Sequence, residues 1–217
     1  PTKTILVDLT KSEEELWGGL SQDARQSVRK ARSNKLQVTS FKFGEKGFAK
    51  SLKEFHKLLT ETGRRQKFWT PGLNLLKAKA EVFGEDATLF IVYSTNKLIN
   101  QSATASSGAP PKAVAGAFTL LNDGTHSASS KEGQKLFAPY SLLWEIIRYL
   151  RKCKKFSYHD LAGIYDPRFH RATRHWQGFT TFKQKFGGKE IEYPAPLIKH
   201  FNPITRTLFS LASNLLP

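Results

Sequence analysis

Lys183 and the aromatic residue before it, Phe182, stand in the stretch GFTTFKQKFGGKEIEYP, which begins at Gly178. Two glycines follow them, Gly187 and Gly188, and paired glycines permit positive φ angles or a close approach of the backbone to a ligand. A lysine and an aromatic ring beside such a turn can hold an anionic or planar group. Residue types alone leave a second interpretation open, a tight bend between two edge strands whose lysines are solvated.

Asp160 and Tyr158 lie two residues apart in FSYHDLAG, a run expected to form a strand that stops at Gly163. Side chains two apart in a strand point to the same face. The carboxylate could accept a proton or orient an ammonium group, and the phenol could form a hydrogen bond with a substrate. A carboxylate that caps the following turn and a core tyrosine are the structural alternatives.

Arg25, Arg29 and Arg32 follow the spacing i, i+4, i+7 in SQDARQSVRKARSNK, which places three guanidinium groups on one face of the expected helix. Lys30 lies on a neighbouring flank. Guanidinium groups in such an arrangement bind phosphates, whereas a solvated helix face is the structural alternative.

The sequence gives little support for other common kinds of functional site. His170 and His175 are five residues apart, which does not place them on one helical face for a metal. The single cysteine, Cys153, lies in the basic run RKCKK and is expected to be a structural thiol. No G-x-S-x-G, P-loop or G-x-G-x-x-G motif is present. We therefore expect neither a metal nor a cofactor.

The charge balance points to anionic partners. The 217 residues include 34 Lys and Arg against 18 Asp and Glu, a formal net charge of +16. Such a field attracts nucleic acid, anionic lipid or a phosphate-rich substrate, although a solubilising surface would have the same composition. One cysteine, no visible signal peptide and no apolar run long enough to cross a bilayer predict a soluble cytoplasmic protein.

The elements that must position these residues alternate between helices and strands. Thr10 or Ser12 can cap a first helix, and Ser21 can cap a second. The segment 47–66 is expected to form a third, amphipathic helix, with Phe48 and its apolar partners facing inward and Gly63 as the residue that ends it. The remaining pattern predicts a surface loop over 95–112 and a helical tail over about 197–217. Strands are expected over 4–10, 36–43, 87–94, 113–121, 123–130 and 156–163, and further helices over 71–84 and 140–155.

This order predicts a mixed α/β fold, a single domain over residues 1–217 with the architecture of acyl-CoA N-acyltransferases (GNAT). An acyl-CoA enzyme needs a glycine-rich turn before its main helix to bind the pyrophosphate. Here Gly133 comes too early, and Pro139 removes a backbone N–H at that position. The sequence therefore predicts a GNAT-like fold without the usual CoA site.

Four segments occur in an order that resembles the FemABX family: RQSVRKARSNKLQV, APYSLLWEIIRYLRK, FSYHDLAGIYD and GFTTFKQKFGGKEIEYPAP. The F-K-x-x-F-G-G signature is the most specific of them, and YHDLAG corresponds to the family's Y-D-x-x-G. FemABX proteins are aminoacyl-tRNA-dependent peptidyltransferases that add amino acids to peptidoglycan precursors, and they usually contain two GNAT-like domains. This chain resembles the second domain. The resemblance therefore defines the acceptor, a peptidoglycan precursor, less well than the donor, an aminoacyl-tRNA.

The resemblance implies roles for the residues singled out above. It places a catalytically important Phe–Lys pair on Phe182 and Lys183, with Lys183 stabilising an oxyanion or a terminal phosphate of the RNA. It implies as partners an aminoacyl-tRNA and a nucleotide-linked or lipid-linked muropeptide, at the inner face of the membrane. The arginine face and Lys30 would then bind RNA or a nucleotide-sugar, with Tyr158, Gly187 and Gly188 also at the substrate.

Two other functions stay open at this point. One is a GNAT-like N-acyltransferase that uses another thioester donor. The other is a non-catalytic module that binds RNA or an anionic membrane surface through its positive charge. The donor that loses its acyl group, charged tRNA or acyl-CoA, separates these alternatives.

Overall fold

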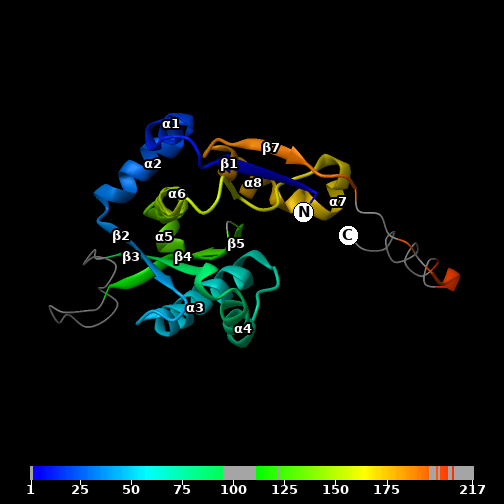
Figure 1. The fold of residues 1–217 in the computed structure, drawn as a ribbon, viewed down its shortest axis with the longest axis horizontal. Helices are drawn as coiled ribbons and strands as arrows, with labels where there is room; N and C mark the ends of the chain where they lie inside the picture. The colour runs from blue at the N-terminus through cyan, green and yellow to red at the C-terminus, as the bar shows by residue number, and fades with distance from the viewer. Residues whose placement is uncertain are drawn as a thin grey trace.

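The computed structural model describes residues 2–94, 111–121, 123–195, 199, 201–204 and 207. The loop expected over 95–112 and the tail expected over about 197–217 lie almost wholly outside these residues. Within them, the predicted mixture of helices and strands is confirmed (Figure 1).

One mixed sheet organises the described residues, with strand order β2-β3-β4-β5-β6-β1-β7. All neighbouring strands pair antiparallel except β5 and β6, which are parallel and share the single pair Asp123↔Asp160. The strands are β1 (Lys3–Asp8), β2 (Leu36–Lys42), β3 (Ala87–Ser94), β4 (Lys112–Leu120), β5 (Asp123–Ser129), β6 (Tyr158–Asp160) and β7 (Lys189–Glu192).

The first two helices begin at the capping residues that the sequence predicts. Ser12 forms a capping box with Glu15 at the first helix, and the Ser21 side chain accepts a hydrogen bond from the N–H of Ala24 at the second. The helices are α1 (Glu13–Gly19), α2 (Gln22–Ser33), α3 (Phe48–Gln66), α4 (Leu73–Phe83), α5 (Lys131–Lys135), α6 (Ala138–Cys153), α7 (His170–Thr173) and α8 (Gln177–Gln184).

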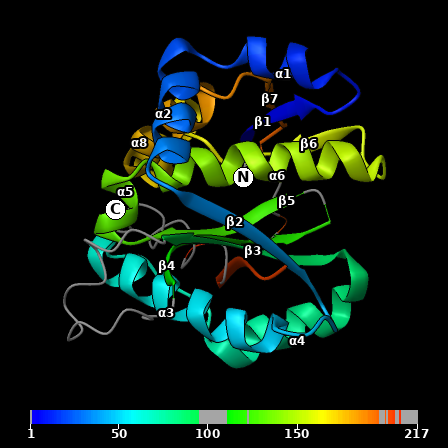
Figure 2. The same cartoon turned by 90° about the vertical axis from the view of Figure 1, so that its left-hand side faces the viewer.

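Two apolar clusters hold the layers together. On one face of the sheet, α3 and α4 pack Phe55 and Leu76 against Leu89 and Phe118. On the other, α1, α2 and α6 surround a second cluster that includes Trp144. Figure 2 shows α6 lying along the sheet, with α1 and α2 beyond it and α3 and α4 on the far side. The long apolar helix α6 is therefore the central support of one half of the molecule.

The structure corrects three sequence predictions. Helix α3 continues past Gly63 to Gln66, because Gly63 packs closely against Thr70 and remains helical. The strand expected over 156–163 is limited to Tyr158–Asp160. The stretch from Gly178 is not a bend between two strands, since it begins within α8, which ends at Gln184, and continues through a turn into β7.

Gly187 and Gly188 connect α8 to β7 with φ angles of +73° and +93°. A Cβ atom on Gly187 would lie 2.9 Å from the carbonyl oxygen of Gly19, and one on Gly188 would lie 2.7 Å from that of Leu6. Both glycines are therefore required by backbone conformation and by close backbone contact within the fold.

We expect Gly188→Ala to lower the free energy of unfolding by about 2 kcal/mol or more, because strain at positive φ adds to the clash with Leu6. Gly44→Ala is the matched control, since Gly44 has a φ of +86° but no atom near its Cβ position. Urea unfolding of both variants measures the difference. Equal losses in the two variants would show that the contact with Leu6 contributes nothing.

Candidate active site

A cavity of about 340 Å³ opens where β5 and β6 separate. After their single shared pair the two strands diverge, so that Ser127 and Ser129 of β5 line one side and His159 and Leu161 line another. A parallel pair that parts in this way leaves a gap in the sheet, which side chains or a ligand must fill. The cavity is therefore a direct consequence of the sheet topology.

Four helices and strand β4 complete the wall. Helix α6 contributes mainly apolar side chains such as Leu142 and Ile146, and α3 contributes Thr62 and Gln66. Helix α8 contributes Phe179, Phe182 and Lys183, whereas α5 and β4 contribute one residue each, Gln134 and Ala117. Residues from elements far apart in the sequence thus meet at one point.

The backbone at the end of β5 is satisfied by α3. The Ser129 carbonyl oxygen accepts hydrogen bonds from Thr62 Oγ1 at 3.2 Å and from Arg65 Nη2 at 2.8 Å. The Ser129 N–H donates to Thr62 Oγ1 at 3.3 Å. Because buried backbone groups need partners, these bonds allow β5 to stay separate from β6 without a ligand.

Lys183 lies at the cavity wall in an anchored position. Its Nζ donates to the carbonyl oxygens of Gly163 at 2.7 Å and Ala162 at 3.2 Å. Ala162 has a φ of +62°, which turns the chain directly after β6. The ammonium group is therefore fixed by the backbone that leaves β6, at a position where its charge can act on a bound group.

Phe182 belongs to an aromatic cluster behind Lys183. Its ring centroid lies 5.0 Å from that of Tyr140 in an edge-on arrangement and 5.3 Å from that of Phe186. Tyr140 and Phe186 are also stacked, at 5.9 Å. These contacts join α8 to the start of α6 and so fix the helix that presents Lys183.

The structure places Tyr158 and Asp160 outside the cavity lining. The Asp160 carboxylate accepts hydrogen bonds from the Thr4 hydroxyl and, at 2.8 Å, from the Ala162 N–H. Tyr158 is 49% exposed. Both side chains follow the strand's alternation away from the cavity, and Asp160 holds the turn after β6.

Sequence reasoning missed His159, whose imidazole lies between Tyr158 and Asp160 in the chain and lines the cavity. It is 1% exposed and pairs in register with Val7 of β1. The same period of two that grouped Tyr158 with Asp160 also places His159 on the opposite face. Only the packing of α6 in the structure shows which face of β6 lines the cavity.

The arginine face forms as predicted, but each member contacts another part of the chain. Arg25 donates to the Gly18 carbonyl oxygen at 3.0 Å, and the Arg29 guanidinium lies 5.6 Å from the Trp17 ring. Arg32 lies 3.5 Å from a carboxylate oxygen of Glu145. Lys30 is likewise 5.2 Å from the ring of Phe137.

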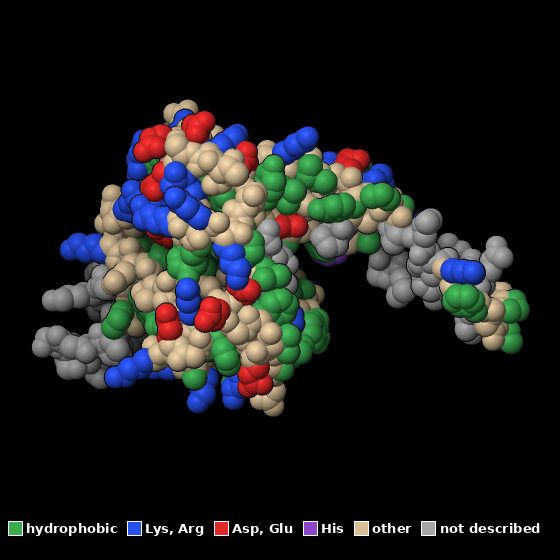
Figure 3. All heavy atoms as spheres, viewed as in Figure 1, with side chains coloured by type: hydrophobic (Ala, Val, Ile, Leu, Met, Phe, Trp, Pro, Cys, Tyr) green, Lys and Arg blue, Asp and Glu red, His purple; other side chains and the backbone are tan. Residues whose placement is uncertain are grey.

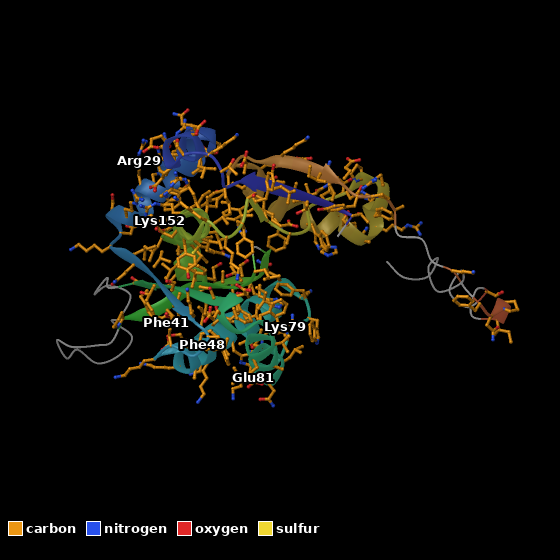
Figure 4. The ribbon with its side chains drawn as sticks, in the orientation of Figure 1. Arg29, Phe41, Phe48, Lys79, Glu81 and Lys152 are labelled. Carbon is orange, nitrogen blue, oxygen red and sulfur yellow. The ribbon has the colours of Figure 1, made fainter. Side chains whose placement is uncertain are left out.

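Helix α6 separates this arginine face from the cavity. Leu142, Leu143 and Ile146 face the cavity, whereas Glu145 and Arg148 point to the opposite side, toward α2 and Glu13. Figure 3 shows Lys and Arg side chains gathered over α2, with acidic side chains among them, and Figure 4 places Arg29 and Lys152 on the same side of the molecule. The arginine face is thus a second, separate surface.

The turn before α6 differs from a CoA-binding turn. Phe137 has a φ of +62° at the start of the helix, and Pro139 occupies its first turn. A Cβ atom on Gly133 would lie 2.2 Å from the Val114 carbonyl oxygen, so this glycine serves packing against β4. The sequence-based expectation that the usual pyrophosphate site is missing agrees with this geometry.

Among the described residues, no group of three metal-ligating side chains comes together. His170 lies beside Tyr165, and His175 packs against Trp176. Within the same residues, no helix is both long and apolar enough to span a bilayer.

Comparison with known proteins agrees with the resemblance. The model described as the FemAB family matches residues 1–102. The crystal structure described as FemX superposes with a TM-score of 0.69 and 18% identity, covering 89% of this chain and 60% of that one. The family match thus covers the first 102 of the 217 residues, and the likeness to FemX extends the shared fold over most of the chain. Lys183 and the F-K-x-x-F-G-G signature lie beyond the residues that the family model matches.

Other solved structures share the fold of this chain. The C-terminal domain of a putative lysylphosphatidylglycerol synthetase from Agrobacterium fabrum has a TM-score of 0.62 and 15% identity, covering 88% of this chain and 58% of that one. L-PGS from Bacillus licheniformis has a TM-score of 0.53 and 12% identity, covering 97% and 64%. The chain thus spans less than two thirds of each of these structures. No curated protein sequence matches it.

Proposed function

We propose that this chain moves an amino acid from aminoacyl-tRNA to an amine of a peptidoglycan precursor peptide, with the reaction at the cavity between β5 and β6. The observation that carries the proposal is the anchored ammonium group of Lys183 at the cavity wall, in the FemABX signature. The match to the FemAB family model over residues 1–102 supports aminoacyl transfer in general. The choice of tRNA as donor and of the muropeptide as acceptor rests on the resemblance.

Aminoacyl transfer from an ester requires few catalytic groups of the protein. An aminoacyl ester is already activated, so an amine needs only to be held against the ester carbonyl while the oxyanion that forms is stabilised. Collapse of the tetrahedral intermediate forms the amide bond and releases the ribose hydroxyl of the tRNA. The positive charge of Lys183 Nζ is suited to stabilise the oxyanion, since carbonyl oxygens hold it in place before the substrate binds.

We expect Lys183→Ala to lower kcat about 10²–10³-fold with little change in donor binding, because the lysine's charge acts on the transition state. Lys183→Arg restores little, since a planar guanidinium does not match a point charge held by two carbonyl oxygens. Single-turnover transfer of a labelled amino acid from tRNA measures the rate.

Lys185→Ala is the matched control for this change. Lys185 lies two residues further on, outside the cavity lining, with its Nζ 3.3 Å from an Asp23 carboxylate oxygen. Lys185→Ala should leave kcat within about twofold of the parent value. Transfer by Lys183→Ala at the parent rate, with the fold intact by thermal unfolding, would refute the mechanism.

His159 is suited to accept the proton that the attacking ammonium group must lose. It lines the same cavity as Lys183, whereas Asp160 is engaged by Thr4 and the Ala162 N–H. A neutral imidazole can take up a proton from an attacking ammonium group and so act as a general base.

We expect His159→Asn to lower kcat about 10²–10⁴-fold and to change the dependence of the rate on pH, because the general base is lost. His159→Gln serves as a second variant with a longer amide. The pH profile separates a chemical role from a packing role, because a residue needed only for packing changes stability without changing the profile. An unaltered profile in folded His159→Asn would contradict the assignment.

The arginine face is the proposed binding surface for the RNA backbone. Arg29 and Arg32 are exposed on α2, and a contact with one phosphate releases about one counterion. Because α6 separates this face from the cavity, the surface would bind the body of the tRNA rather than its aminoacyl end. We further propose a cytoplasmic location, where charged tRNA is available, with contact to an anionic membrane through the same basic charge.

We expect the double variant Arg29→Ala, Arg32→Ala to bind tRNA more weakly and to lower the salt dependence of binding by about one to two units. The double variant Lys53→Ala, Lys77→Ala removes the same charge from exposed positions on α3 and α4, across the sheet, and is the control. Filter binding at several salt concentrations gives both slopes. Equal slopes for the two double variants would show that the arginine face has no specific part in binding.

A further inference from the structure

The cavity has few charged side chains for a site that would hold an amino acid. Among the described residues that line it, there is no Asp or Glu, and Lys183 is the only lysine or arginine. Several of its polar groups are already engaged: Thr62 Oγ1 donates to the Leu58 carbonyl oxygen at 2.8 Å, and Gln134 Nε2 to Ser129 Oγ at 3.3 Å.

The remaining wall is aliphatic and aromatic. Leu142 and Ile146 of α6 are buried in the core, and Leu161 continues the wall beyond β6. Phe179 of α8 also lines the cavity and is 44% exposed, so its ring borders the opening. An apolar wall that ends at an exposed aromatic ring favours an apolar group entering from solvent.

We infer that this cavity binds the side chain of the transferred amino acid and selects a neutral apolar side chain of leucine to phenylalanine size over a lysine side chain. The inference rests on the proposed function, because it takes an aminoacyl group as the ligand. It names a substrate class that neither the family match nor the fold comparison assigns.

The size of the cavity agrees with this class. A dry apolar cavity of about 150 Å³ is sufficient to bind benzene. The cavity here, at about 340 Å³, therefore has room for an isobutyl or benzyl side chain, with the α-amino group of the aminoacyl group left at the opening. An alanine methyl group would leave most of the apolar wall without contact, and each methylene that it lacks weakens binding.

Charge excludes the basic alternative. A lysine side chain entering the cavity would lose its hydration and find no carboxylate among the described lining residues. It would also be repelled by Lys183. One structure that shares the fold is named as a putative lysylphosphatidylglycerol synthetase, so the preference inferred here would distinguish this chain from a protein that uses lysine.

Ala117 offers a way to test the wall directly. It lies on β4 opposite Ser127, is 3% exposed and lines the cavity. Ala117→Val adds two methyl groups at this position, and valine is a residue type that is common in strands. Ala113→Val is the matched control, because Ala113 is on the same strand but packs against the cluster formed by α3 and α4.

The experiment measures binding by calorimetry of four stable analogues, 3′-amino-3′-deoxyadenosine carrying leucine, phenylalanine, alanine or lysine in amide linkage. We expect the leucine or phenylalanine analogue to bind at least about tenfold more tightly than the alanine and lysine analogues. Ala117→Val should reduce this preference about tenfold, with little change for the alanine analogue. Ala113→Val should leave all four affinities unchanged.

The outcomes distinguish this inference from the proposed function. Equal affinities for the four analogues, tightest binding of lysine, or an unchanged preference in folded Ala117→Val would overturn the inference. Absence of binding by all four would overturn it as well. If the preference holds but no amino acid is transferred from charged tRNA, the inference about the cavity stands and the proposed reaction is wrong.

Discussion

The separation of β5 from β6 after one shared pair is the constraint on which the rest of the structure depends. Parallel strands that diverge leave backbone groups without partners in a buried region, and such groups are costly unless another element satisfies them. Thr62 and Arg65 of α3 do so at Ser129, and the apolar side of α6 fills the space beneath. The gap can therefore persist as a cavity. Because β6 ends at the pair where β5 begins, side chains from β6 and α8 reach the cavity without any long loop.

The connection between β6 and α8 gives the cavity its charge. Asp160 holds the turn after β6 through the Ala162 N–H, and the carbonyl oxygens of Ala162 and Gly163 then hold Lys183. The close contact of Gly188 with Leu6 keeps the end of α8 against β1. A residue that looked like a candidate base thus acts through backbone geometry, and it positions the lysine rather than contacting the cavity.

Two electrostatic surfaces are divided by α6. One is the arginine face, whose members already contact Trp17, Glu145 and backbone carbonyl oxygens. The other is the nearly apolar cavity with a single lysine. A long anionic ligand with a small reactive end can use both, since exposed guanidinium groups bind phosphates in water whereas one charge acts more strongly where water is scarce. This division fits a donor such as charged tRNA.

The sequence by itself determined the mixed α/β class, the helix starts at Ser12 and Ser21 and the arginine face, because local capping and a period of 3.6 residues are enough to predict them. It also singled out Lys183 through a signature. Only the tertiary structure decided that His159 lines the cavity while Asp160 and Tyr158 do not, and that Gly188 packs on Leu6. The alternation of a strand divides residues into two faces, but it does not say which face is covered. That depends on where α6 packs, which is a contact between residues far apart in the chain.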